Sequence, residues 1–212
     1  MAITGLLLLG FVIGHMVGNL QIFLKPEVIN SYGAFLKSMG PLLWVVRLGL
    51  LACVGLHIWA AVSLALDNRA ARPAGYAQYK PAGATYASRT MVWSGVIVLS
   101  FIIYHLLHFT VGMVNPEFLQ WHDGEGRHDI YKMVISGFQH PLVSFFYILS
   151  MGLLCMHLSH GVSSLFQSLG LRTSLYKNWI DRFAQITAWS IFVGNSVIPL
   201  AILLGYGREV LN

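Results

Sequence analysis

Four histidines lie deep inside four hydrophobic segments of this chain. They are His15 in GHMVGN, His57 in GLHIWAA, His105 in IIYHLLHF and His157 in CMHLSHG. A histidine in the middle of a lipid-spanning helix is costly, and it normally faces the protein interior and has a function. Four of them at matching places in four segments predict ligands for two shared cofactors.

Each of these histidines precedes the polar end of its own segment by ten residues. The end residues are Lys25, Asp67, Asn115 and Gln167. Each imidazole is therefore about 15 Å from the C-terminal end of its helix, at 1.5 Å per residue. Because successive spans run in opposite directions, this spacing creates two layers whose depths differ by roughly 10 Å. We expect His15 and His105 to form an outer pair near the external face. His57 and His157 then form an inner pair near the cytoplasm.

Two imidazoles in each layer suit haem iron better than zinc. Zinc takes about four ligands, or three and a water in a catalytic site, and the sequence places no Asp or Glu beside either pair. Haem brings four nitrogens, so two axial histidines complete its iron and leave no open position, which suits electron transfer. We therefore predict two b haems, one for each pair. No CxxCH motif for covalent attachment occurs.

Three other polar residues lie within reach of the predicted haem sites. His108 and His160 each follow a proposed ligand by three residues, almost one helical turn, and share much of its face. Each could be the true ligand, bond a haem propionate, line a quinone pocket or form a hydrogen bond within the bundle. Arg47 lies about 15 Å outward of His57, roughly level with the outer pair. It would either neutralise propionates there or extend to the membrane interface.

Small residues surround the four histidines, and two interpretations of them stay open. They are Gly14, Gly18, Gly55, Ala60, Ala61, Gly152 and Gly161. Their size would let a flat macrocycle approach the backbone, or would simply allow close helix packing. Because candidate polar side chains are few, we expect the second ring nitrogen of each ligand to donate to a backbone carbonyl one turn back.

The composition places the chain in the integral-membrane class. Of its 212 residues, 56% are hydrophobic and 10% charged, whereas soluble domains carry about 25% charged residues. The mean hydropathy is +0.66. We expect one all-α domain over residues 1–212 with five transmembrane helices, the first four forming the haem-binding bundle. The expected spans are 3–24, 42–66, 91–114, 139–169 and 183–206, with a short surface helix around 32–38 and a loop over 70–89.

The distribution of Lys and Arg predicts the orientation. Seven fall in the connectors after the second and fourth spans, and five lie on the opposite side. The positive-inside rule then gives a multi-pass protein of the cytoplasmic membrane, with a cytoplasmic N-terminus and an external C-terminus. The net charge of +5 lies in short loops between spans, which favours lipid headgroups over nucleic acid as its partner.

With these segments in order, the chain resembles the single-subunit dihaem cytochrome b membrane anchor of complex II (succinate dehydrogenase/fumarate reductase, type B). The resemblance spans nearly the whole chain, and four segments carry it: GHMVGNLQIF, LLWVVRLGLLACVGLHIWAAVSLA, YHLLHF and FFYILSMGLLCMHLSHGVSSLFQSLG. It implies b haems on His15, His57, His105 and His157. It also implies docking on a flavoprotein and an iron–sulfur subunit, and a quinone, expected to be menaquinone, as substrate.

The resemblance further implies a route for electrons. They would pass from the iron–sulfur subunit to the inner haem, then to the outer haem and then to quinone. The chain would thus be an oxidoreductase only as a subunit of the complex. Some fumarate reductases of this type carry a glutamate for proton transfer two residues before the helix-four ligand. Cys155 occupies that place here, which argues against such a route.

Other classes of protein fit parts of the pattern. The cytochrome b subunit of a formate dehydrogenase or hydrogenase is also a haem-bearing bundle. A non-haem structural or transport protein could pair its histidines with helix hydroxyls instead. GHMVGN matches the HxxxN of a rhomboid-like protease, but no GxSG nucleophile motif occurs in any span.

Overall fold

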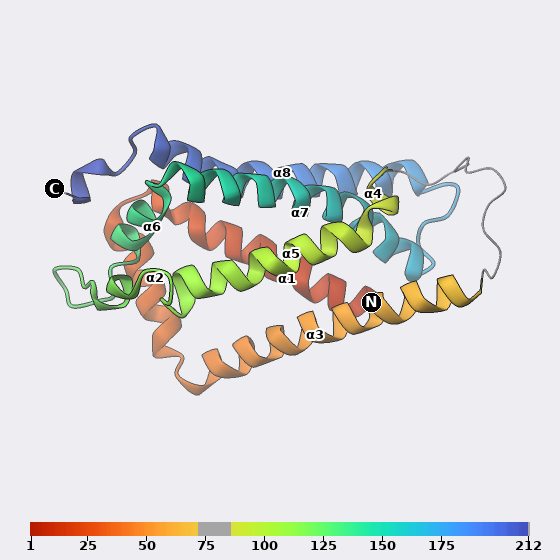
Figure 1. Ribbon diagram of the computed structural model, residues 1–212, viewed down its shortest axis with the longest axis horizontal. Coiled ribbons are helices and arrows are strands. Elements are labelled where there is room, and N and C mark those ends of the chain that lie inside the picture. The colour runs from red at the N-terminus through yellow and green to blue at the C-terminus, as the bar shows by residue number, and fades with distance from the viewer. Residues whose placement is uncertain (72–85, 212) are drawn as a thin grey trace.

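The computed structural model describes residues 1–71 and 86–211 and is helical in all its long segments (Figure 1). Five helices are long and apolar enough to cross a membrane. They are α1 (Ala2–Leu20, continued by η1, Gln21–Phe23), α3 (Pro41–Ala70), α5 (Met91–His105, continued by η2, Leu106–Thr110), α7 (Pro141–Ser168) and α8 (Lys177–Leu203). Within the described ranges no β-strand occurs, which confirms the all-α membrane class with five spans.

Two spans are longer than expected because charged residues continue the helix at its end. α3 runs to Ala70 instead of residue 66, and Arg69 in its last turn suits the negative end of the helix dipole. α8 begins at Lys177 instead of residue 183. Its Asp181 accepts hydrogen bonds from Arg172 and lies 3.3 Å from the Lys177 ammonium. Most of the expected 70–89 loop, residues 72–85, lies outside the described residues.

The third span ends earlier than expected and changes its helical pitch first. Val111 N–H donates to the Leu106 carbonyl, five residues back, so the last turn is π-helical. Gly112 then takes a positive φ of 70°, which a glycine adopts without steric cost. The helix therefore stops at Thr110, short of residue 114. Single π turns of this kind are frequent at functional sites.

The long helices differ in how closely they pack. α8 packs along α7 and α1, and Ala184 and Ala188 are fully buried one turn apart. Small residues at this spacing let two helix backbones approach. By contrast α3 carries no buried residue, and its main packing partner is α1. Among the described residues, α3 is therefore the most loosely packed of the five spans.

Short helices form a cap over one end of the bundle. The cap comprises α2 (Pro26–Ser38), η3 (Pro116–Gln120), a loop over 121–129, α6 (Ile130–Phe138) and η4 (Arg208–Leu211). Only a helix over 32–38 was expected here. Pro26 extends α2 because proline suits a first helical turn, and α6 was not predicted. α4 (Tyr86–Arg89) lies at the opposite end of the bundle (Figure 1).

A buried asparagine ties the cap together. Asn30 on α2 is 2% exposed, and its amide donates to Asp123 and Asp129 in the loop. Its carbonyl accepts from the Tyr131 N–H of α6. Desolvation opposes ionisation of Asp123, but hydrogen bonds from Arg127 outweigh it and lower the pKa of Asp123 to about 2.

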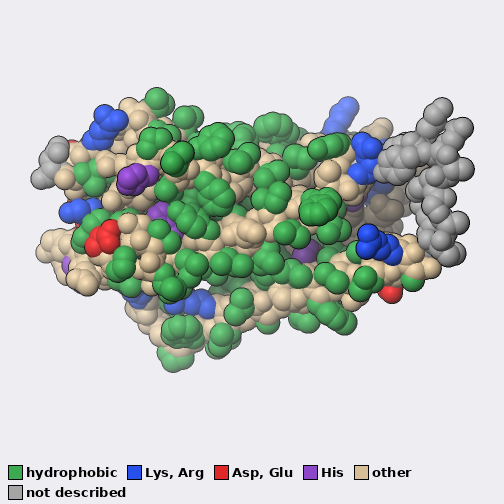
Figure 2. Space-filling model, in the orientation of Figure 1, with side chains coloured by type: hydrophobic (Ala, Val, Ile, Leu, Met, Phe, Trp, Pro, Cys, Tyr) green, Lys and Arg blue, Asp and Glu red, His purple; other side chains and the backbone are tan. Residues whose placement is uncertain are grey.

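The surface of the molecule has the pattern of a membrane protein. Figure 2 shows hydrophobic side chains across the middle of the visible face, with most Lys, Arg, Asp and Glu toward the two ends. An apolar belt of this kind faces lipid hydrocarbon, and the charged ends face headgroups and water. The chain is thus a multi-pass membrane protein.

Candidate functional site

The structure brings His15 of α1 and His105 of α5 together. Their ring centroids are 5.6 Å apart, with the planes at 84°. His15 is exposed, and it forms no hydrogen bond with any residue of the described ranges. Its other ring neighbour is Phe11, which stacks on it at 5.3 Å. Half-way along a lipid-spanning helix, this imidazole therefore has both nitrogens without a protein partner.

The separation of the outer pair fits an iron between the two rings. Two metal–imidazole bonds of about 2 Å each place the ligating nitrogens about 4 Å apart and the ring centroids about 6 Å apart. The 5.6 Å between His15 and His105 is close to that value. The residues present thus suit a metal with two axial imidazoles.

His105 is surrounded by aromatic rings. Phe101 stacks on it at 5.8 Å, and Phe109 and Tyr147 approach it at 5.9 and 6.0 Å. The Tyr147 hydroxyl lies 3.4 Å from His105 Nδ1 and 3.0 Å from His108 Nδ1. Tyr147 thus links the outer-pair histidine to a second, fully buried histidine. The sequence analysis did not single out Tyr147, because it lies ten residues from the nearest proposed ligand on its own helix.

The inner pair, His57 of α3 and His157 of α7, has no ring contact like that of the outer pair within the described ranges, and each imidazole instead contacts a hydroxyl of a neighbouring helix. The Nδ1 of His57 lies 3.2 Å from the Thr4 hydroxyl of α1. The Nδ1 of His157 lies 3.1 Å from the Ser94 hydroxyl of α5. Both imidazoles are half-buried.

These contacts correct one sequence prediction. Backbone carbonyls one turn back were expected to fix the ligand rings, yet His57 and His157 use hydroxyls of a neighbouring helix. The physical reason is that each ring points across the bundle, where a hydroxyl of the neighbouring helix lies within hydrogen-bond distance. The hydroxyls were missed because Thr4 and Ser94 lie far from both imidazoles in the sequence.

The small residues near the histidines divide into two groups. A Cβ added at Gly14, Gly55 or Gly161 would meet no atom within 4 Å, so the space beside them is open. A Cβ at Gly18 would lie 2.9 Å from the Tyr32 ring, and one at Gly152 would lie 3.8 Å from Phe192. Gly18 and Gly152 thus serve helix packing, and the other three glycines leave room for a flat ligand.

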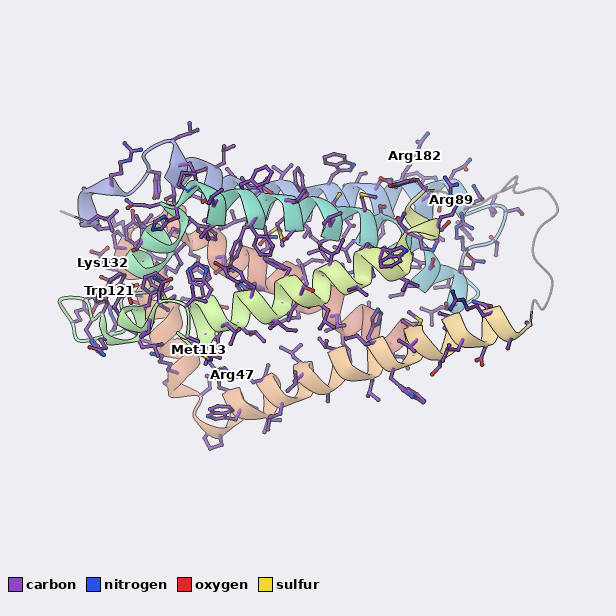
Figure 3. The ribbon with its side chains drawn as sticks, viewed as in Figure 1. Arg47, Arg89, Met113, Trp121, Lys132 and Arg182 are labelled. Carbon is purple, nitrogen blue, oxygen red and sulfur yellow. The ribbon has the colours of Figure 1, made fainter. Side chains whose placement is uncertain are left out.

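Arg47 lies in the first turns of α3 and is exposed (Figure 3). Its guanidinium carbon is 5.2 Å from the centroid of the Trp44 ring, a cation–π contact. It forms no ion pair with an acidic residue of the described ranges. An anion such as a propionate could therefore form an ion pair with Arg47. Both expectations for Arg47, a propionate partner or a side chain that extends to the membrane interface, stay open.

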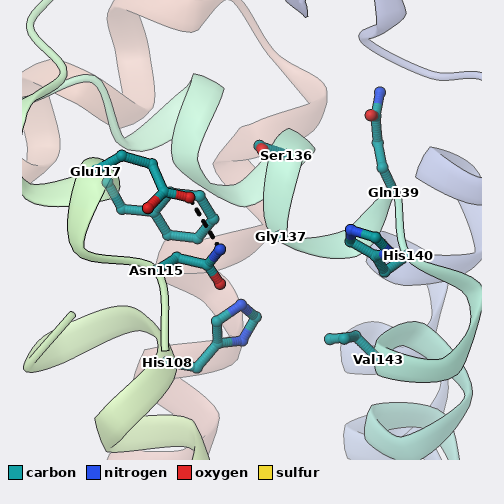
Figure 4. A pocket seen from close by; sticks show the side chains of 9 residues that line it. His108, Asn115, Glu117, Ser136, Gly137, Gln139, His140 and Val143 are labelled. Carbon is teal, nitrogen blue, oxygen red and sulfur yellow. Dashed lines mark hydrogen bonds between the residues drawn. The ribbon is translucent and has the colours of Figure 1, made fainter. Parts of the chain in front are cut away.

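His108 lines a polar cavity at the cap end of the bundle (Figure 4). The cavity has a volume of about 290 Å³, and Asn115, Glu117, Gln139 and His140 also line it. Asn115 donates to Glu117 at 3.0 Å, and this hydrogen bond lowers the pKa of the exposed Glu117. His108 therefore faces a pocket and does not join the outer pair.

His160 stays on its own helix. Its Nε2 lies 3.0 Å from the hydroxyl of Ser164, four residues on. This contact matches the expectation of a hydrogen bond within the bundle. The roles as ligand, propionate partner or quinone contact stay predictions for His160.

No group of three or more His, Cys, Asp or Glu that could hold a metal ion occurs in residues 1–71 and 86–211. The two pairs of histidines therefore offer two ligands each, which suits a metal that brings its own ring of nitrogens. No protein-family model, curated protein or solved structure matches this chain.

Proposed function

We propose that this chain is a dihaem cytochrome b that carries electrons across a membrane. The observation that carries the proposal is His15: an exposed imidazole, 5.6 Å from His105, with no hydrogen-bond partner among the described residues. A polar group without a partner in an apolar medium costs several kcal/mol, roughly 2–7 depending on the reference. A ligand from outside the chain removes that cost.

The residues of each pair would hold one haem b. When bound by two axial imidazoles, haem b supplies reversible one-electron transfer. His15 and His105 would hold the outer group, and His57 and His157 the inner one. The open space beside Gly14 and Gly55 would accommodate its flat face, and α3, the most loosely packed span among the described residues, would form a wall of the site. Four helices thus contribute one ligand each.

We also propose that the chain anchors a complex II-type succinate dehydrogenase or fumarate reductase. The support is the ordered resemblance of four helices together with basic residues at the end away from the cap. Arg89 and Arg182 lie at that end (Figure 3). An iron–sulfur subunit and a flavoprotein would dock there. A purified complex that contains flavin supports this assignment, whereas molybdenum or nickel supports a formate dehydrogenase or hydrogenase.

The cavity beside His108 is our candidate for the quinone site. Its polar lining offers hydrogen bonds to a headgroup, and its volume of about 290 Å³ is at the lower end of typical ligand pockets. An apolar groove beside it, lined by Tyr104, Leu142 and Phe146, shares Val143 with the cavity. A ligand with a polar head and an isoprenoid tail suits this pair of sites.

One observation favours a second candidate, a non-haem structural or transport protein. His57 and His157 pair with helix hydroxyls, as such a protein would require. His15 distinguishes the two candidates because no hydroxyl of residues 1–71 or 86–211 forms a hydrogen bond with it. A purely structural bundle gains nothing from an imidazole left bare in the membrane.

A reduced-minus-oxidised visible spectrum of the purified protein tests the proposal. We expect the narrow α-band of a b-type, low-spin haem that disappears on oxidation. A preparation of intact, folded protein without that band would remove the haem proposal and leave the structural candidate.

A further inference from the structure

A hydroxyl residue followed by glycine recurs at the same place in α1 and α5. The two copies are Thr4-Gly5 before His15 and Ser94-Gly95 before His105, with 11 residues from hydroxyl to imidazole in each. Eleven residues make just over three helical turns, so both groups lie on one helix face about 16 Å apart. Each of these helices thus carries an outer-pair histidine and, one layer inward, a Ser/Thr–Gly pair.

Each Ser/Thr hydroxyl contacts the inner-pair histidine of the next long helix. Thr4 of α1 lies 3.2 Å from His57 Nδ1 of α3. Ser94 of α5 lies 3.1 Å from His157 Nδ1 of α7. The helix pairs α1–α3 and α5–α7 therefore repeat one arrangement.

Each glycine lies under the same imidazole as its hydroxyl neighbour. A Cβ added at Gly5 would lie 3.6 Å from His57 Cε1, and one added at Gly95 would lie 3.7 Å from His157 Cε1. An added Cβ would therefore just reach van der Waals contact with each ring, and in the native protein each ring faces the glycine backbone. A side chain larger than alanine would push the ring away.

The hydroxyl protons determine which ring nitrogen is protonated. The Thr4 hydroxyl lies 2.9 Å from the Met1 carbonyl, and the Ser94 hydroxyl lies 3.0 Å from the Met91 carbonyl, both in donor geometry. A hydroxyl has one proton, so a hydroxyl that donates it to the carbonyl accepts in its contact with histidine. Nδ1–H of each imidazole is then the donor, and a neutral ring has its free lone pair on Nε2.

We propose that Thr4-Gly5 and Ser94-Gly95 are a repeated seat that sets the tautomer and orientation of the two inner-pair histidines. The seat makes both rings present Nε2 to the same iron, so Thr4 and Ser94 are positioning residues. This inference rests on the proposed function. A hydrogen-bond acceptor on the second nitrogen raises the basicity of a ligand, so it stabilises ferric over ferrous iron at the inner site alone.

The test is a redox titration of the purified complex that carries Ser94→Ala. The inner component is identified as the one lost in His57→Ala. At a fixed potential we expect the ferrous-to-ferric ratio of the inner haem to rise about tenfold. This rise corresponds to an increase of about 59 mV in the midpoint potential of a one-electron couple. The haem affinity of the inner site falls about tenfold. The outer component stays unchanged.

Three further variants make the result specific. Thr4→Val should shift the midpoint potential of the inner haem in the same direction. Ser94→Thr, which keeps a hydroxyl at this position, should titrate like the wild type. Ser100→Ala is the matched control, because Ser100 lies on the same helix and donates only to the Val96 carbonyl. It should change neither component.

The outcomes separate the inference from the proposed function. Wild-type protein with two haems whose titration is the same in Ser94→Ala and Ser100→Ala would overturn the seat and leave the cytochrome intact. Equal shifts of both components would also overturn it. Wild-type protein without haem would overturn both proposals together.

Discussion

The inner and outer histidine pairs differ in how their rings are held. At the inner pair, hydroxyls of Thr4 and Ser94 contact both imidazoles at 3.2 and 3.1 Å. At the outer pair, His15 stacks on Phe11 and has no hydrogen bond to a described residue, and His105 lies among aromatic rings with a longer contact of 3.4 Å to the Tyr147 hydroxyl. The comparison teaches that one histidine position, repeated at two depths, is oriented mainly by hydroxyl contacts in one layer and mainly by ring packing in the other.

The largest expected effect comes from removal of the ligands themselves. His57→Ala or His157→Ala should each remove the proposed inner haem and leave the proposed outer one, because the inner iron would lose one of its two protein ligands. His15→Ala and His105→Ala should each remove the outer haem. The haem content of each variant and the components of its α-band measure which haem is lost. If His57→Ala and His105→Ala abolished the same spectral component, the pairing would be wrong.

The next effect sharpens the role of Tyr147 at the outer pair. Tyr147→Phe leaves the buried Nδ1 of His108 without its hydroxyl partner, which costs about 1–3 kcal/mol of folding free energy. We expect a lower unfolding midpoint in detergent and no change in the inner component. Tyr104→Phe is the matched control, since the Tyr104 ring packs against His108 but its hydroxyl forms no hydrogen bond with it. Equal losses in the two variants would contradict the hydrogen-bond role.

A smaller effect tests the aromatic packing of the outer pair. Phe101 stacks on His105, and an aromatic pair contributes about 0.5–1.5 kcal/mol beyond its buried area. Phe101→Leu should therefore weaken retention of the outer haem about two- to tenfold and spare the inner one. Haem-transfer kinetics measure the loss. Phe166→Leu, which breaks the Phe166–Phe183 contact at the other end, should leave the outer haem unchanged; equal loss from both variants would refute the packing role.

The smallest expected effect is the response of the cap, which covers the outer end of the bundle, to low pH. The pKa of Asp123 is lowered to about 2 from its ordinary 3.8, so its ionised form stabilises the cap above pH 3.8. That stabilisation is lost as pH falls from about 4 toward 2. Fluorescence of Trp121, which packs against Lys132, should stay constant from pH 7 to about 5 and change below 4. A transition centred above pH 5 would show that another group controls the cap.

The sequence predicts the five spans because hydropathy alone sets them, and it predicts that His15 and His105 meet because equal spacing in antiparallel helices fixes their depth. The span ends differ where charges stay helical, as at Arg69 and Lys177. The cap helix α6 was missed because a nine-residue helix in a polar connector has no membrane signal. The seat of Thr4 and Ser94 was missed although its 11-residue spacing to the next histidine is readable, because the contact itself crosses to another helix.

The ligand role of all four histidines is tested most directly by the number of b haems per chain in the purified, folded protein. Extracted haem measured against quantified protein should give two per chain. His57→Ala should give one, and His57→Ala combined with His15→Ala should give none. A wild-type value well below two, or two haems retained in the double variant, would contradict the assignment of these histidines as axial ligands.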